Sequence, residues 1–509
     1  MTEFLAGLST IVSSPSAIFW CFLGVLLGTI LGALPGLGAV TGIAMLLPLT
    51  FHLSSLNGLL LLMCVYMGVQ FGGRISAILI NIPGDATAVV STFDGYPLAR
   101  QGRAGFALTI SAIASFIGGL IGIIGLVFLT SKLAQVSLLF GPMDYFALML
   151  FTLIATCGVL EKKPLKPLIA VSMGVLISTI GLDAVTGQAR LTFGTPYLWD
   201  GIHIVAIAIG LFGLSETFFR FEQRKKNVGE ADSLSDKIKF SSLFPKTSEM
   251  IKDLGAMLRG SIVGFVIGVL PGAGGVLATF LSYGLEKKIS KEPDKFGQGA
   301  SKGLSTAEAA NNSAVGGALI PTFALGIPGS GAAAVLLGGL LIMGLQPGPM
   351  MLTNSGDIVW AAFAGLFIGN VLLLLLNVLL VPFFATLIVK AEPYMMAIIA
   401  ALCFIGVYFT DNSLFNVGVM IVFGILGYFL RKTGFPLAPL FLGVILGPMV
   451  EKNLRQSLSM SQGDYSIFFV NPISCTLLIL SGAILLMPLL RFLSRVMKLG
   501  GNRRKSIVS

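Results

Sequence analysis

Two short phrases that join proline, glycine and small polar side chains are the places where this sequence could bind a solute. One is N-I-P-G-D-A-T at Asn81–Thr87, and the other is G-I-P-G-S at Gly326–Ser330. Proline removes a backbone amide and glycine permits non-helical dihedral angles, so each phrase predicts an interrupted helix. The freed amides at the start of a half-helix suit a carboxylate. The freed carbonyls, together with Asn, Ser and Thr oxygens, suit a sodium ion.

A second pair of interruptions carries the phrase L-P-G-x-G. GVLLGTILGALPGLG occupies Gly24–Gly38 and GSIVGFVIGVLPGAG occupies Gly260–Gly274, with every glycine of the first copy repeated at one constant spacing. Unpaired backbone groups are costly in lipid, so four breaks in two matched pairs predict a shared polar cavity. For Gly24, Gly28 and Gly32 we favour helix packing over ligand binding, because Gly-x3-Gly spacing lets membrane helices approach closely. Repeated Gly/Pro interruptions point to a secondary transporter and to its binding site.

These interruptions and their polar neighbours define the predicted site. We expect substrate binding at Pro35, Gly36, Gly38, Asn81, Gly84, Thr87, Pro271, Gly272, Gly274, Pro328, Gly329, Ser330 and Arg74. We expect cation binding at Asp85, Asn311, Asn312 and Thr322.

Three of the charged residues leave alternatives open. An intramembrane arginine is a functional candidate, and Arg74 could hold a substrate carboxylate, pair with Asp85 or Asp94, or lie at a helix end. Asp85 could ligate a cation, help to carry a proton, or cap a helix after Pro-Gly. Glu308 has the same ambiguity.

The elements that must position these residues are membrane helices. The chain has 509 residues, of which 55% are hydrophobic and 11% are charged, whereas soluble domains carry about 25% charged residues. Long apolar runs rich in Leu, Ile, Val, Ala and Gly predict an all-α polytopic membrane protein of about 12 spans rather than an outer-membrane barrel. The runs lie at 15–50, 56–82, 104–131, 142–160, 165–182, 198–219, 256–285, 303–345, 357–389, 393–410, 413–430, 434–450 and 471–495.

The polar stretch 220–255 divides the chain into two related membrane halves, 1–219 and 256–509, and we expect it to be a cytoplasmic linker. The net charge of +10 comes mainly from short basic loops and the C-terminal tail, which the positive-inside bias places in the cytoplasm. The basic tail also favours anionic lipid at the inner face of the bilayer. The second half has room for one extra helix, which we place at 393–410.

The orientation of the two halves is predicted inconsistently. Block 256–285 has basic loops on both sides, which predicts a re-entrant hairpin, whereas block 15–50 has none, which predicts a hairpin from the opposite side and hence inverted repeats. A weaker match, P-L-x-P-L at Pro164 and at Pro436, has basic residues upstream in both copies and argues for one shared orientation. The conflict stays open at the level of sequence.

The sequence predicts no enzyme, because it carries no HExxH, GxSxG or Walker A motif and no Asp-rich phosphate–metal motif. We therefore expect no catalytic residue and no cofactor, with Na+ or H+ as the coupling ion. His52 and His203 are isolated and indicate no metal site, and the five cysteines form no CxxC pair, so we interpret them as reduced packing residues. The basic loops do not indicate nucleic-acid binding. A stand-alone carrier and a channel remain alternatives, although a channel needs no paired hairpins.

Several segments together resemble the large membrane subunit of the tripartite tricarboxylate transporters, the TctA-like proteins. The resemblance spans nearly the whole chain. Its motifs are GALPGLGAVTGIAMLLP, FGGRISAILINIPGDATAVVSTFDGYPLARQGRAG, GVLPGAGG, AEAANNSAVGGALIPTFALGIPGSGAAAVLLGGL and GFPLAPLFLGVILGPMVE.

The resemblance implies a bacterial inner-membrane protein that works with a small integral membrane subunit and a periplasmic solute-binding protein. It implies uptake of a carboxylate such as citrate, coupled to an ion gradient that is most often sodium. An elevator movement of the hairpin-bearing part against a scaffold is the architecture that we expect. The resemblance places the site at Pro35–Gly38, Asn81–Thr87, Pro271–Gly275, Asn311–Asn312 and Ile327–Ser330.

Overall fold

The computed structural model describes residues 2–34, 37–158, 165–183, 186–223, 247–271, 274–380, 397–408 and 412–486. Nearly all of its regular structure is helical, as the sequence predicts; within the described residues the strands are one antiparallel pair, β1 (Gly181–Leu182) and β2 (Ala189–Arg190). The α-helices are α1 (Thr2–Ser13), α2 (Pro15–Ala33), α3 (Ala39–Leu46), α4 (Ser55–Ile80), α5 (Val89–Leu98), α6 (Ala104–Ser137), α7 (Pro142–Gly158), α8 (Leu165–Ser178), α9 (Ile204–Ala208), α10 (Ser215–Gln223), α11 (Thr247–Val269), α12 (Gly274–Ile289), α13 (Ser301–Leu325), α14 (Gly331–Ile342), α15 (Pro349–Asn354), α16 (Gly356–Leu379), α18 (Leu414–Lys432), α19 (Leu437–Met460) and α20 (Ile467–Val470). Shorter helical segments are η1 (Leu47–His52), η2 (Ala86–Ala88), η3 (Ala99–Arg103), η4 (Pro196–Leu198), η5 (Ile209–Leu214) and η8 (Pro293–Lys295).

Many of these helices are long and apolar enough to cross a bilayer. Among the described residues, six helical stretches meet that condition, and shorter apolar helices include Ala397–Tyr408, where the extra helix was expected, and Pro472–Leu486. Local sequence explains several helix starts, because Ser14, Ser330 and Ser413 each accept a hydrogen bond from an amide in the first turn of α2, α14 and α18. The chain is therefore a multi-pass membrane protein.

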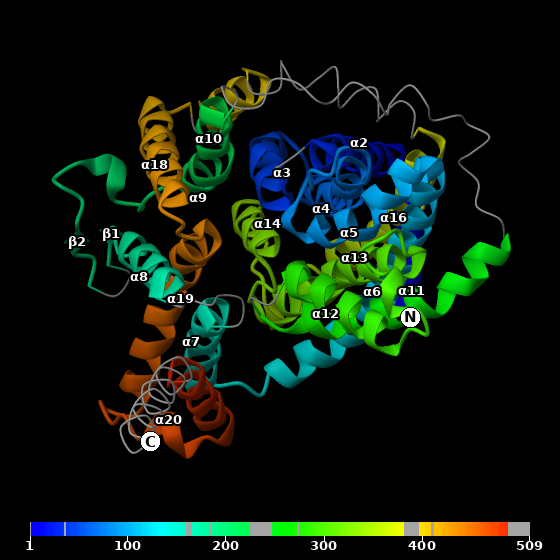
Figure 1. Cartoon of the computed structure of the whole chain (residues 1–509). Helices are drawn as coiled ribbons and strands as arrows, with labels where there is room; N and C mark the ends of the chain where they lie inside the picture. Colours follow the sequence, from blue (N-terminus) through cyan, green and yellow to red (C-terminus); the bar gives the residue numbers. More distant parts are fainter. Residues whose placement is uncertain are drawn as a thin grey trace, which may run out of the picture.

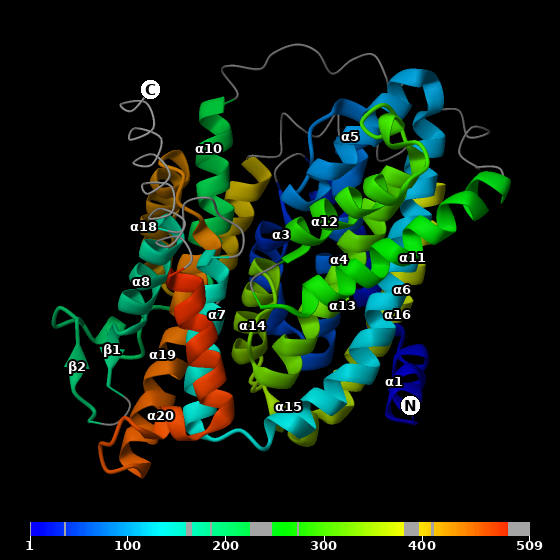
Figure 2. The same ribbon diagram turned by 60° about the horizontal axis from the view of Figure 1, so that its bottom comes forward.

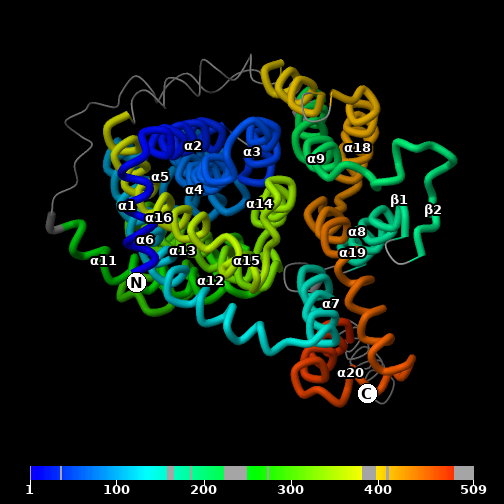
Figure 3. Tube along the Cα trace, turned by 180° about the vertical axis from the view of Figure 1, so that it is seen from behind, coloured from blue at the N-terminus to red at the C-terminus, as the bar shows by residue number. Residues whose placement is uncertain are grey.

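The helices form two groups that stand side by side in Figures 1, 2 and 3. The broken-helix group contains α1–α6 and α11–α16, which carry the four predicted interruptions. The lateral group contains α7–α10 and α18–α20. Contacts between the groups run through α3, which packs on η5, and α14, which packs on α9 and α19. Both contacting helices begin directly after an interruption.

The internal repeat of the sequence is a repeat of contacts in the structure. A Cβ atom built on Gly28 of α2 would lie 2.6 Å from the carbonyl oxygen of Val65 in α4, and one built on Gly264 of α11 would lie 2.2 Å from that of Ala310 in α13. The same close approach occurs one turn earlier and later, at Gly24, Gly32, Gly260 and Gly268. The packing interpretation of these glycines is therefore confirmed.

The two broken helices α4 and α13 run in opposite directions. The start of α4 lies at the end of α14, where the Ser55 hydroxyl donates to the Met343 carbonyl oxygen at 3.3 Å. The start of α13 lies at the end of α5, where the Gly299 and Ala300 amides donate to Asp94 at 2.9 and 2.8 Å. Each half thus places its broken helix antiparallel to that of the other half.

The weaker P-L-x-P-L match behaves differently, because α8 and α19 run in the same direction. Cβ atoms built on Gly443 and Gly447 would contact Val171 and Ser178 in that order along both helices. The beginnings of the two helices also meet, since the Lys166 ammonium donates to the Thr433 carbonyl oxygen at 2.5 Å. The P-L-x-P-L helices α8 and α19 are thus parallel, whereas α4 and α13 are antiparallel. This difference explains why the sequence predicted conflicting orientations for the two halves.

Loops expected in the cytoplasm lie near one another. Arg103 pairs with Glu249 at 2.7 Å, and the Gln101 side chain donates to the Gln298 carbonyl oxygen at 2.9 Å. Both ends of the proposed linker 220–255 are helical, because α10 extends to Gln223 and α11 starts at Thr247. Residues 224–246 and the basic tail, 487–509, lie outside the described residues.

Candidate functional site

The first interruption separates α2 from α3, and a carboxylate caps the second of these helices. One carboxylate oxygen of Asp85 accepts from the Ala39 amide at 3.4 Å, and the other accepts from the Ala86 amide at 2.6 Å. Asp85 therefore caps α3 and η2 together, which is the helix-cap alternative left open for this residue; that a half-helix start binds a substrate carboxylate stays a prediction. Gly38 lies against the same carboxylate, whereas Pro35 and Gly36 lie outside the described residues.

The second interruption, between α4 and η2, folds back on its own helix. Asn81 ends α4 in the left-handed region, with φ of 57°, and its side chain is exposed. Gly84 returns to the middle of α4, where its amide donates to the Gly73 carbonyl oxygen at 3.1 Å. A Cβ atom on Gly84 would lie 1.9 Å from the Gly32 carbonyl oxygen, so only glycine permits this approach.

The third interruption, between α11 and α12, meets the second. A Cβ atom on Gly275 would lie 2.9 Å from a methyl carbon of Thr87 and 3.2 Å from the side-chain oxygen of Asn311. The Thr87 hydroxyl donates to the Gln70 amide oxygen at 2.8 Å. Gly274 starts α12 with a positive φ of 61°. The two residues before it, Gly272 and residue 273, lie outside the described residues.

The fourth interruption, between α13 and α14, meets the first. Ser330 caps α14 by accepting from the Ala333 amide at 3.1 Å, and its hydroxyl is 2.8 Å from the Tyr66 hydroxyl of α4. A Cβ atom on Gly331 would lie 3.4 Å from Val40 of α3 and 3.1 Å from Ala438 of α19.

All four interruptions therefore gather around α4 and α13; the shared polar cavity that the sequence predicts there stays a prediction. Gly329 takes part in this gathering, since a Cβ atom built on it would lie 2.6 Å from the α-carbon of Ala318 in α13. Pro271 and Pro328 border the third and fourth interruptions. Which of these residues bind a solute stays a prediction.

Several buried polar atoms of α13 have no hydrogen-bond partner among the described residues. They include both polar atoms of the Asn311 amide, the side-chain oxygen of Asn312 and the Ser313 hydroxyl. The Asn312 nitrogen donates to the carbonyl oxygen of Glu308 at 3.1 Å. By contrast, the Thr322 hydroxyl is engaged within its own helix, donating to the Ala318 carbonyl oxygen at 2.7 Å. Asn311 and Asn312 thus have polar atoms without any partner among the described residues, whereas the Thr322 hydroxyl already has one.

Arg74 lies on the side of α4 that faces α6 and α16. Its guanidinium is 0% exposed and donates to the Leu108 carbonyl oxygen at 2.7 Å, to the Ser111 hydroxyl at 2.8 Å and to the Asn377 amide oxygen at 3.1 Å. None of these partners belongs to an interruption.

Asp94 has a role that the sequence did not reveal. One of its carboxylate oxygens accepts from the amides of Gly297, Gly299 and Ala300, and the other accepts from the Tyr283 hydroxyl at 2.9 Å. Asp94 thus joins α5 to the start of α13 and to α12. Asp94 lies inside α5, and nothing in the sequence around it names the distant amides that it binds.

Glu308 is buried in α13 between two helices of the other half. Its carboxylate accepts from the Ser91 hydroxyl of α5 and from the Ser115 hydroxyl of α6, the latter at 3.0 Å. The described residues contain no group of three or more His, Cys, Asp or Glu side chains that could hold a metal ion. A site on α13 would therefore rest on one carboxylate with neutral oxygens, the kind of donor set that a hard cation accepts.

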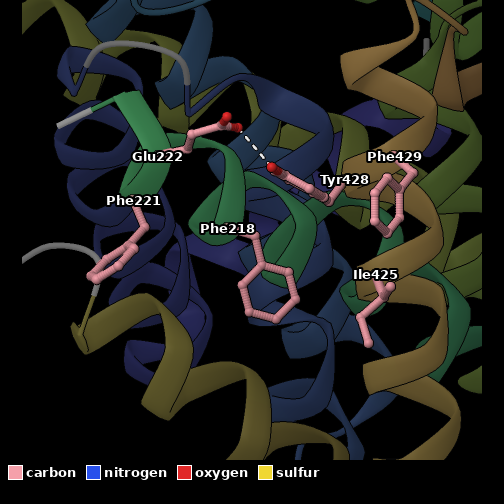
Figure 4. Close-up of a pocket in the computed structure, with 6 residues that line it drawn as sticks. All are labelled: Phe218, Phe221, Glu222, Ile425, Tyr428 and Phe429. Atoms are coloured by element: carbon pink, nitrogen blue, oxygen red, sulfur yellow. Dashed lines mark hydrogen bonds between the residues drawn. The ribbon is translucent and has the colours of Figure 1, made fainter. Parts of the chain in front are cut away.

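A groove of about 520 Å³ lies elsewhere, between α10 and α18 of the lateral group (Figure 4). Its walls are apolar apart from Glu222, whose carboxylate accepts from the Tyr428 hydroxyl at 2.7 Å. The other lining residues are Phe218, Phe221, Ile425 and Phe429. It contains none of the predicted site residues, and its lining is what a lipid-facing surface requires.

Two matched sets of broken helices that meet at one place define the class of a polytopic membrane transport protein. Within that class, the chain belongs to the TctA family: the family described as "Tripartite tricarboxylate transporter TctA family" matches residues 18–442. An Agrobacterium vitis protein described as "Uncharacterized 52.8 kDa protein in TAR-I ttuC' 3'region" is 40% identical over 479 residues, which cover 94% of each chain. Another from that organism, "Uncharacterized protein in TAR-II ttuC' 3'region", is 42% identical over 217 residues, 42% of this chain and 89% of its own. No solved structure matches the chain.

Proposed function

We propose that this protein is the large transmembrane subunit of a secondary transporter that imports a small carboxylate, such as a tricarboxylate or dicarboxylate, by symport with Na+. The observation that carries the proposal is the meeting of the four interruptions, where the start of α3 already binds the carboxylate of Asp85. A substrate carboxylate has the same chemistry as that side chain. Amides of the remaining half-helix starts, at Gly274 and Ser330, are suited to the same task.

The cation would bind where oxygen ligands and a carboxylate lie beside the interruptions. Asp85, Asn311 and Asn312 supply such atoms, and Asn311 and Asn312 have unpartnered ones. The Thr322 hydroxyl donates its hydrogen within α13, which leaves the lone pairs of its oxygen available to join them. Arg74, by contrast, would reach a substrate only after leaving α6 and α16, so its substrate role is the least supported part of the predicted site.

Family membership supports two protein partners, a small integral membrane subunit and a periplasmic solute-binding protein. It also supports a bacterial inner-membrane location, with about 12 spans and a cytoplasmic C-terminus. The antiparallel α4 and α13 support inverted repeats, with 1–219 and 256–509 as the two halves. The separation into a broken-helix group and a lateral group supports an elevator movement of the first against the second (Figure 1).

Uptake by proteoliposomes that contain this chain and the small subunit, with and without the binding protein, tests the proposal. We expect carboxylate accumulation that requires a Na+ gradient and the binding protein. The variants Asp85→Asn and Asn312→Ala should raise the Na+ concentration for half-maximal uptake, whereas the matched variant Asn57→Ala, at the start of α4, should not. Unchanged Na+ dependence in both site variants would contradict the assigned ligands. Uptake without the binding protein would indicate a stand-alone carrier, and flux without ion coupling would indicate a channel.

A further inference from the structure

Glu308 is a buried carboxylate that the proposed function does not use. It is 1% exposed, in the first third of α13, and its two hydrogen-bonding hydroxyls come from α5 and α6 of the other half. Ser91 and Ser115 are equally buried. The site thus spans the boundary between the two halves, inside the broken-helix group.

The internal repeat supplies a control for what the fold itself requires here. Aligning Pro83 with Pro328 aligns Glu308 with Met63 and Ser91 with Leu336. The shared Phe-Ile-Gly at 116–118 and 367–369 aligns Ser115 with Leu366. Met63, Leu336 and Leu366 are all buried in the main apolar core.

The same packing position is therefore polar in one half of the molecule and apolar in the other. Burying a carboxylate costs several kcal/mol even after partial compensation, and apolar residues of similar volume are often as stable or more so. Met63, Leu336 and Leu366 demonstrate that the fold accepts apolar residues in the corresponding place. An intramembrane carboxylate that the fold does not need is expected to serve function.

The polarity continues along α13 toward the interruptions. Asn312 aligns with Met67 of α4, and Asn311 aligns with Tyr66. The Asn312 amide lies one turn from Glu308, to whose carbonyl oxygen it donates, and its own side-chain oxygen is 1% or less exposed and has no partner among the described residues. That oxygen is a second, independent indication of a ligand at this place.

We propose that Glu308, Ser91, Ser115 and Asn312 form a sodium site that belongs to the transport core. One carboxylate and three neutral oxygens are the ligands that a hard monovalent cation prefers, and an unhydrated cation would neutralise Glu308. This proposal rests on the proposed function, since it names a group on which the coupling ion is carried. The proposal adds the Glu308 carboxylate, at the boundary between the halves, to the cation ligands already proposed beside the interruptions.

Arg74 explains why such a cation would be coupled to an anionic substrate. It donates to Ser111, one turn from Ser115 on α6, and its charge acts on Glu308. Arg74 and Glu308 together are neutral, so a sodium ion leaves one positive charge in the buried region. A substrate carboxylate at the nearby interruptions would offset that charge, so each ligand favours the binding of the other.

Cation-dependent thermal stability of the purified full chain, together with any subunit that copurifies, tests the site without any transport. We expect NaCl to raise the melting temperature in a saturable way, whereas KCl and choline chloride at equal ionic strength do not. Glu308→Gln and Glu308→Met should abolish this Na+-specific shift. Glu308→Met copies the aligned residue Met63 but leaves Arg74 without an opposite charge, so where it fails to fold the double variant Arg74→Leu/Glu308→Met, which copies both apolar counterparts, takes its place. The matched control is Glu286→Gln, which removes another buried carboxylate, bound to Arg259 at 2.8 Å, and should keep the shift.

The proposal is overturned if both Glu308 variants retain the Na+-specific shift of the unmodified chain, or if the unmodified chain has none. Its failure is separable from failure of the proposed function. A Na+-specific shift that depends on Glu308, in a chain that accumulates no carboxylate with its partners present, would leave the site standing and remove the carboxylate transporter. Na+-driven uptake by a chain whose Na+ response ignores Glu308 would do the reverse.

Discussion

At the scale of single residues, charge placement is what distinguishes the two halves of this protein. Arg74 aligns with Leu319, and Glu308 aligns with Met63, so both charges have apolar counterparts. The residue types alone mark them as candidates, because charges inside membrane segments are rare. The sequence could not name their partners, since Ser91, Ser115 and Asn377 are distant in the chain and ordinary in type.

Removing Arg74 should be strongly destabilising, because Glu308 would keep a buried charge without compensation. We expect Arg74→Leu to lower the stability by about 3–5 kcal/mol. The double variant Arg74→Leu/Glu308→Met, which copies the apolar counterparts, should recover most of that loss. Melting curves of the single and double variants form a double-mutant cycle that measures the coupling. A double variant no more stable than Arg74→Leu would refute the charge pairing.

At the scale of elements, the sequence predicted which helices break but not how the breaks meet. Pro-Gly fixed the ends of α2, α4, α11 and α13 to within a few residues, because both residue types act locally. The return of Gly84 onto Gly32 and Gly73 depends on packing between helices, which no local signal encodes. The sequence predicted opposite directions for the blocks 15–50 and 256–285, and α2 and α11 pack along α4 and α13, which run in opposite directions. It predicted one shared direction for the two P-L-x-P-L segments, and α8 and α19 do lie parallel, so the two predictions conflicted only because both were applied to the whole of each half.

The glycines of α2 (Gly24, Gly28 and Gly32) and of α11 (Gly260, Gly264 and Gly268) should be equally intolerant of a side chain. Gly264→Ala places a methyl group 2.2 Å from the Ala310 carbonyl oxygen, so α11 must move away from α13. We expect a loss of about 1–3 kcal/mol from overpacking, and the same for Gly28→Ala against Val65. Gly284→Ala is the matched control, because no heavy atom lies within 4 Å of that site. Melting temperatures in detergent measure the difference; equal values for Gly264→Ala and Gly284→Ala would show that the close approach does not matter.

At the scale of the whole molecule, the arrangement separates the parts that bind from the part that anchors. Every described interruption belongs to the broken-helix group, whereas the lateral group contributes apolar surfaces and the groove between α10 and α18 (Figure 4). The groups touch chiefly through α3 and α14, so their mutual surface is small compared with the packing inside each group. Such an interface permits sliding of one rigid group against the other.

If the groups move relative to each other during transport, a covalent link between them should stop uptake. Gly331 of α14 and Ala438 of α19 are suited to this test, because their Cβ positions would be 3.1 Å apart, so a small outward shift reaches the separation of about 3.5–4.5 Å that a disulfide spans. In a background without the native cysteines, oxidation of Gly331→Cys/Ala438→Cys should abolish carboxylate uptake, and a reductant should restore it. The matched pair Ser215→Cys/Gly427→Cys, whose Cβ positions are 2.9 Å apart within the lateral group, should form a disulfide with little effect. Full uptake by the oxidised α14–α19 pair would exclude movement at this contact and, with it, the elevator.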